Sequence, residues 1–303
     1  MAATTATSRH GGDWRRVVWP LRLSVLLAAV GLWANRAAAQ SLLDTLWSAL
    51  REEAYFKTVY FETYYVILVF GAIVMSTKYL DRIAFLDRFK IERRPSFRSH
   101  KKRWFAKEAL VYAAPLATLD TLLVKWYDRV PAEDVAWRKR LWIQTTRALP
   151  VEAPGVFELV AHVLVALLIF DALFFAVHLT LHKVPCLYRT FHALHHTHAD
   201  GLHSWVTNQL SVVERVLLVL SANAALKVQG AHPLSRVAFV PFFVWLLVEN
   251  HSNYDFPWAY DKLLPRGLAG GSAAHHAHHR TSRGHYQPFL TYLDWMAAKM
   301  GST

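Results

Sequence analysis

Cysteine is almost absent from this sequence: among 303 residues the only one is Cys186. A single thiol excludes an internal disulfide framework and a thiolate-rich zinc site. Repeated strand signals, an internal repeat and a glycine-rich dinucleotide fingerprint after a strand are missing as well. These absences exclude a disulfide-stabilised secreted domain, a solenoid and a chain that carries its own nicotinamide-binding fold.

Apolar residues, in contrast, are abundant. They make up 54% of the chain, and the mean hydropathy is +0.17. This composition is typical of a polytopic membrane protein with a sizeable water-facing part. The net charge is +12, but ten Lys and Arg residues crowd between Arg82 and Lys107, between two apolar segments. Because such a loop marks the cytoplasmic side of a membrane and attracts anionic lipid headgroups, we expect no nucleic-acid partner.

The N-terminal region contains a segment of targeting type. Residues 1–16 are polar, Val17–Trp33 is apolar, and small residues follow at Ala37–Ala39. This order is similar to a cleavable secretory signal or to an uncleaved anchor. Either one leaves the segment from Gln40 to about Lys57 on the lumenal side.

Three membrane spans are expected further along the chain. About 20 residues cross the hydrocarbon core of a bilayer. Val59–Met75 and Val156–Val177 meet this requirement, whereas Ala109–Val124 is a weaker candidate. Starting from the lumen, these three crossings and the basic loop bring the chain back to the cytosol at His178.

Two further apolar runs, Val212–Val228 and Leu234–Val248, are each short for a full crossing. We expect a helical hairpin that enters the membrane and, either as two crossings or as a re-entrant pair, returns the chain to the same side. The predicted fold is therefore all-α: a polytopic membrane helical bundle with a cytosolic, histidine-rich di-metal cap. The predicted parts are a disordered start with a signal-like or anchor-like segment (1–40), N-terminal membrane helices with the basic loop (41–155) and a histidine-box domain (156–303).

Thirteen of the 17 histidines lie between His178 and His279. Nine of them form one HxxxH motif, two HxxHH motifs and one isolated position: His178 and His182, His192, His195 and His196, His275, His278 and His279, and His251. Residues three or four apart share a helix face, so each cluster can direct two or three imidazoles to one point. A low-complexity tract or a tag would be contiguous, which these histidines are not.

Neutral imidazole is the commonest protein ligand for metals and suits iron, zinc, copper and nickel. One ion rarely takes more than about six ligands, so nine converging imidazoles predict two ions. His198 is a possible additional ligand. Ligating histidines usually donate their second nitrogen to an acceptor such as a carboxylate. Asp171, seven residues before His178, and Glu214, at the start of the hairpin, are the candidates, with a surface or capping role as the alternative for each.

The segments HLTLH (178–182), FHALHH (191–196), ENHSNYDFPW (249–258) and HHAHH (275–279) together resemble the fatty acid hydroxylase/sterol desaturase superfamily of membrane-bound di-iron oxygenases. The likeness is greatest to its sterol hydroxylases. It covers roughly Ser41–Trp295 and is strong only after Asp171. One departure is Ala274, which stands where the third motif of the family commonly has a further histidine.

This resemblance implies a non-haem di-iron monooxygenase that hydroxylates a sterol with O2. It also implies two Fe ions and NADPH-derived electrons delivered by a reductase or cytochrome b5. A multi-pass endoplasmic reticulum location with the histidines facing the cytosol follows from the same resemblance, as does a role in lipid and sterol metabolism. No catalytic side chain is expected beyond the metal centre.

Other functions remain open at the level of sequence. A carbon-4 methylsterol monooxygenase, or a sphingoid-base or fatty acyl hydroxylase of the same superfamily, would share these motifs. A metal-binding membrane protein without oxygenase activity would spread its ligands along a path through the bilayer. A zinc–histidine hydrolase would turn over without O2.

Overall fold

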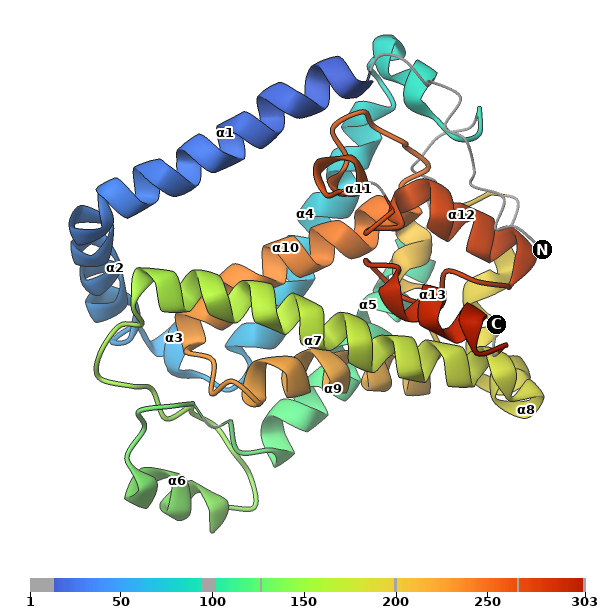
Figure 1. Cartoon of the computed structure of the whole chain (residues 1–303). Coiled ribbons are helices and arrows are strands. Elements are labelled where there is room, and N and C mark those ends of the chain that lie inside the picture. Colours follow the sequence, from blue (N-terminus) through green and yellow to red (C-terminus); the bar gives the residue numbers. More distant parts are fainter. Residues whose placement is uncertain (1–13, 94–101, 126, 199–200, 266, 302–303) are drawn as a thin grey trace.

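The computed structural model describes residues 14–93, 102–125, 127–198, 201–265 and 267–301 (Figure 1). Within these ranges the chain forms helices and only isolated β-bridges, which confirms the predicted all-α class. The α-helices are α1 (Trp14–Ala34), α2 (Arg36–Leu50), α3 (Ala54–Lys57), α4 (Phe61–Leu80), α5 (Lys102–Leu122), α6 (Ala132–Lys139), α7 (Val156–Lys183), α8 (Pro185–Leu187), α9 (Val212–Lys227), α10 (Pro233–His251), α11 (Tyr260–Leu263), α12 (Gly271–Thr281) and α13 (Tyr292–Lys299). Four short turns of other helix types are η1 (Ala84–Phe89), η2 (Tyr188–His192), η3 (His195–His198) and η4 (Ser204–Asn208).

Within the described ranges, four helices are long and apolar enough to cross a membrane: Arg16–Ala34 of α1, and α4, α7 and α10. The outer face of α7 carries a row of exposed apolar side chains, Phe157, Val160, Leu164 and Leu168, spaced three or four residues apart. An apolar stripe of this kind on a water-exposed surface would be unfavourable, whereas it suits contact with lipid. The chain is therefore a multi-pass membrane protein, as its composition predicted.

One expectation about the hairpin was wrong. We expected both of its apolar runs to be short for a crossing, but α10 extends beyond Leu234–Val248 at both ends and qualifies as a span. His232 caps its start by accepting a hydrogen bond from the Leu234 N–H, and Pro233 occupies the first turn, where a missing N–H costs nothing. The 16-residue α9 is shorter than a span, as expected.

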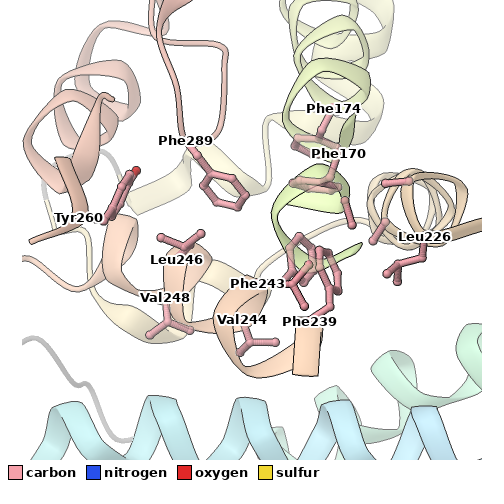
Figure 2. Close-up of a cluster of buried hydrophobic side chains, with 14 of the residues drawn as sticks. Phe170, Phe174, Leu226, Phe239, Phe243, Val244, Leu246, Val248, Tyr260 and Phe289 are labelled. Atoms are coloured by element: carbon pink, nitrogen blue, oxygen red, sulfur yellow. The ribbon is translucent and has the colours of Figure 1, made fainter. Parts of the chain in front are cut away.

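The membrane helices pack around α10. In Figure 1, α10 lies between α4 and α7, and α9 packs on α7. Phe170 of α7 meets Phe243 of α10 edge to face at 4.6 Å between ring centroids. Figure 2 shows these rings together with Phe239 and with Phe289 from the C-terminal segment. Aromatic pairs in this geometry contribute about 0.5–1.5 kcal/mol beyond their buried area, so they fix the helix ends that carry the histidines.

Helix α1 lies outside this bundle but is tied to it. The Arg22 guanidinium donates to the backbone carbonyls of Lys262, Leu263 and Leu264 at 2.8–3.0 Å. These carbonyls belong to α11 and the residue after it, close in sequence to the third histidine motif. The anchor-like segment therefore supports the end of the molecule that contains the histidines.

Candidate metal centre

The first two histidine motifs are joined by a sharp change of helix type. His178 and His182 occupy successive turns at the end of α7, which stops where Val184 turns to an extended conformation before Pro185. A single π-helical turn, η2, then carries His192, and His195 and His196 follow in and around η3. Wide turns of this kind occur mostly at functional sites, because they redirect side chains that a regular helix would separate.

The third motif depends on a glycine. Helix α12 begins at Gly271, whose φ is +66°, a conformation that L side chains rarely adopt. A Cβ atom at this position would lie 2.4 Å from the Asp261 carboxyl carbon. Only glycine can therefore bring the start of α12 against α11, and this contact aims His275, His278 and His279 at the other motifs.

The nine predicted histidines meet in two groups. The first group contains His178, His182, His192, His196 and His278, and the second contains His195, His251, His275 and His279. Within each group, one nitrogen from every residue lies within 4.8 Å of all the others. All nine side chains are buried or half-buried. Each group could hold one metal ion.

Both HxxHH motifs contribute to both groups, and helix geometry explains how. His275 and His279 are four residues apart, share one face of α12 and belong to the second group. His278 lies on a different face of α12 and belongs to the first group. The second motif divides in the opposite sense, because His192 and His196 join the first group while His195 joins the second.

A second hydrogen bond fixes the direction of several rings. The Nδ1 atoms of His178, His251 and His278 lie 2.7, 2.7 and 2.6 Å from the carbonyl oxygens of Tyr286, Leu247 and Gly284. A carbonyl oxygen can only accept, so each Nδ1 carries the proton. Each Nε2 atom is therefore left with a lone pair that points into its group.

The resulting arrangement fits cations. The Nε2 atom of His192 lies 3.2, 2.9 and 3.1 Å from the Nε2 atoms of His178, His182 and His196. The Nδ1 atom of His192 lies 2.7 Å from Glu214 Oε1, and with Glu214 ionised this Nδ1 donates the proton, which leaves Nε2 none to share among three neighbours. The Nε2 atom of His278 is buried without a hydrogen-bond partner among the described residues. Converging lone pairs repel one another unless a positive ion lies between them.

The protonation of the histidines outside the membrane helices agrees with this geometry. Burial lowers the pKa of His192 to about 2 and that of His196 to about 4. Burial, together with neighbouring imidazoles, holds the pKa values of His195, His275 and His279 well below 6.5. These side chains are neutral at physiological pH, which is the form that binds metals.

The two candidate supporting carboxylates have different partners. Glu214 accepts the hydrogen bond from His192, in the position expected for a carboxylate behind a ligand. Asp171 instead accepts hydrogen bonds from the backbone N–H of Phe289, at 2.6 Å, and from Gln287. Among the described residues it bonds the C-terminal segment rather than a histidine. The side chain of His198 lies outside the described residues.

Sequence reasoning missed the backbone acceptors. Residues 284–290 wrap over the end of α7, and the carbonyls of Gly284 and Tyr286 orient two histidines. A backbone carbonyl has no sequence signature. The only available signal was the QPFLTYLDW segment (287–295), which resembles the closing segment of the superfamily.

A hollow beside the histidines is lined in part by His178, His195, Leu218 and Leu247. A larger cavity lies between α4, α5, α9 and α10 and shares Leu218 and Leu247 with it. This bundle cavity is lined mainly by apolar side chains, among them Phe70 and Phe243. An elongated apolar molecule in the bundle would therefore reach the histidines with one end.

Comparison with known proteins agrees with this site. Residues 163–298 match the fatty acid hydroxylase family. Mouse cholesterol 25-hydroxylase is 32% identical over 276 residues, which are 88% of this chain and 85% of the relative. The chain therefore belongs to the fatty acid hydroxylase/sterol desaturase superfamily, as its motifs predicted.

Two further relatives have similar names. A zebrafish cholesterol 25-hydroxylase-like protein is 30% identical, with 83% of this chain and 95% of the relative covered. Rat cholesterol 25-hydroxylase is 41% identical over about half of each chain. These relatives confirm the predicted likeness to the sterol hydroxylases of the superfamily. No solved structure matches the chain.

Proposed function

We propose that this protein is a di-iron sterol hydroxylase of the cholesterol 25-hydroxylase type. The observation that carries the proposal is the convergence of nine neutral imidazoles in two groups at one end of a membrane-embedded apolar cavity. Two iron ions held there would supply the O2-dependent redox chemistry that an unactivated carbon–hydrogen bond requires. The two histidine groups described above are the proposed ligands.

The side chains of the chain itself have three tasks in this reaction. Leu218 and Leu247 keep water away from the passage between the cavity and the histidines. Glu214 and the carbonyls of the 284–290 segment hold the rings in one orientation. The aromatic walls place the substrate carbon beside the metal groups and make the encounter effectively intramolecular.

We also propose that the histidines face the cytosol from the endoplasmic reticulum membrane. Segment 89–92, part of the basic stretch, pairs with residues 253–255 directly after His251. The basic stretch and the histidines therefore lie at the same end of the bundle, and positive loops favour the cytosolic side. There an NADPH-dependent reductase or cytochrome b5 would deliver the electrons.

Product analysis tests this function. Cells that express the chain are fed cholesterol under 18O2, and their lipid extract is analysed by mass spectrometry. We expect a side-chain hydroxylated sterol that contains one 18O atom. His195→Ala and His278→Ala, one from each group, should abolish the product while membrane expression persists.

The alternatives give different results in the same experiment. Oxidation at the sterol carbon-4 methyl group, or hydroxylated sphingoid bases or acyl chains, would assign the chain to another member of the superfamily. Turnover without O2 would indicate a zinc hydrolase. A metal-loaded protein that forms no oxidised lipid would be a metal-binding membrane protein.

A further inference from the structure

A cluster of charged side chains lies inside the bundle at the end opposite the histidines. The Glu62 carboxylate accepts hydrogen bonds from Arg236 at 2.9 and 3.0 Å and from Arg147 at 3.1 Å. Lys125 lies 2.8 Å from Asp120 and 3.5 Å from Glu62. Ionisable groups inside a membrane bundle are costly and are typically kept for a function.

Part of this cluster has a structural role. Arg147 also donates to the Phe56 carbonyl, and Lys125 donates to the Val59 carbonyl at 2.9 Å. These bonds tie the connection between α5 and α7 to the start of α4. They do not explain why Glu62 and Arg236 also line the bundle cavity.

The bundle cavity has two chemically different ends. At the far end its wall includes Glu62, Asp120, Asn223 and Arg236. The Asn223 side chain accepts a hydrogen bond from Arg236, and its amide donates to the Val219 carbonyl at 3.0 Å. At the near end, Thr207, Leu210, Leu218 and Leu247 line both the bundle cavity and the histidine hollow, so the wall there is mostly aliphatic. A ligand that fits both ends has a polar group at one end and hydrocarbon at the other.

The distance between these ends suits a sterol. Arg236 and Leu247 both line the cavity and lie eleven residues apart on α10, which is about 16 Å at 1.5 Å per residue. His251 lies one helical turn beyond Leu247. A sterol with an extended side chain has comparable length, a single hydroxyl on its first ring and reactive tertiary carbon at the other end.

One other cation, Arg215, lines the cavity nearer to the histidines. Its guanidinium donates to the carbonyl of Asn208 at 3.0 Å and lies over the Tyr112 ring at 5.2 Å. These contacts connect α9 to η4 and α5. The cluster around Glu62 differs, because there carboxylate, amide and guanidinium groups meet at one point, as a hydroxyl requires.

We propose that the cluster of Glu62, Asp120, Asn223 and Arg236 binds the ring hydroxyl of the sterol and makes the substrate enter the site tail first. This inference rests on the proposed sterol hydroxylase function. A hydroxyl donates one hydrogen bond and accepts others. Here a carboxylate oxygen accepts a hydrogen bond from the sterol hydroxyl, and the Asn223 amide or the Arg236 guanidinium donates a hydrogen bond to the hydroxyl oxygen. The cluster thereby selects both the substrate and the carbon that is oxidised.

The test compares cholesterol with its methyl ether, which keeps the shape but has no hydroxyl proton. The full chain in phosphatidylcholine nanodiscs is assayed for binding of each radiolabelled sterol and, with a reductase, for turnover. A site built around a hydroxyl rejects an analogue that lacks the donor, so we expect wild type to prefer cholesterol at least about tenfold. In Asn223→Leu the preference should fall to within about twofold.

Ser221→Ala is the matched control, because the Ser221 hydroxyl donates to the Leu217 carbonyl of the same helix. It should keep the full preference, and Asn223→Gln should restore part of it. A thermal unfolding curve for each variant separates folding from recognition. If Asn223→Leu loses stability but keeps the tenfold preference for cholesterol, the cluster has only a structural role, and the inference is overturned.

The remaining outcomes separate the two proposals. Equal use of both sterols by wild type, or hydroxylation on the rings, would overturn tail-first binding and leave a sterol hydroxylase in place. Neither sterol binding nor sterol product would overturn both. Preferential binding of cholesterol without any product would support the hydroxyl site and contradict the enzymatic function.

Discussion

For four of the nine imidazoles, the direction of the ring is set by the partner of the nitrogen that points away from the metal groups. Carbonyls from residues 284–286 and Leu247 hold three rings, and the Glu214 carboxylate holds His192. The nine histidines and Glu214 could be selected from the sequence because helix periodicity and ligand chemistry act over short distances. The hydrogen-bond partner of Asp171 could not be predicted from the sequence, because it lies more than 110 residues away and contacts Asp171 only in the folded structure.

Removing the acceptor behind His192 should weaken metal binding. Glu214→Leu keeps the bulk of the side chain and loses the hydrogen bond, so we expect iron affinity to fall about 10- to 100-fold. Glu214→Gln retains an oxygen acceptor and should lose less. Iron per chain is measured by elemental analysis during titration with a chelator. Glu133→Gln, at an exposed position of α6, is the control, and equal iron retention by Glu214→Leu would contradict the role.

Gly271→Ala tests the glycine at the start of α12. The positive φ alone costs an alanine about 1–2 kcal/mol, and the contact with Asp261 adds a steric clash. Gly267→Ala is a matched control with φ +84° but open space around its Cβ. We expect Gly271→Ala to lose iron and thermal stability, and Gly267→Ala to lose only stability. Identical behaviour of the two variants would show that the clash is unimportant.

At the scale of elements, the helix positions could be predicted better than their lengths. The apolar runs predicted the positions of α4, α7 and α10. The full length of α10 could not be predicted, because the helix continues beyond the apolar run at both ends into residues that are buried inside the protein. The pairing of α1 with α11 had no sequence signal, since it depends on one arginine and three backbone carbonyls.

Arg22→Leu should loosen α11 while leaving α1 apolar enough for the membrane. We expect faster hydrogen exchange at the amides of Leu263 and Leu264, which donate to Ala259 and Tyr260 within that turn. Arg16→Leu, at an exposed position of the same helix, serves as the control. The role of Arg22 would be refuted if both variants exchanged at the wild-type rate.

At the scale of the whole molecule, the orientation that we propose would place α6 in the lumen and the turn after α12 in the cytosol. A glycosylation acceptor introduced by Asp134→Asn with Ala136→Thr should be modified in cells. An acceptor introduced by Arg283→Asn with His285→Thr should stay unmodified, although Arg283 is exposed. A mass shift removed by endoglycosidase reports modification, and the reverse pattern would invert the proposed orientation.

We propose that two iron ions, each held by its own histidine group, carry the activity. This proposal is tested by the iron content of purified protein, measured together with sterol hydroxylation while iron is removed and restored. We predict two iron atoms per chain in fully active protein and sterol hydroxylation that falls and rises with the iron content. Zinc added in place of iron should not restore hydroxylation. Full hydroxylation by the zinc-loaded or iron-free protein would contradict the claim.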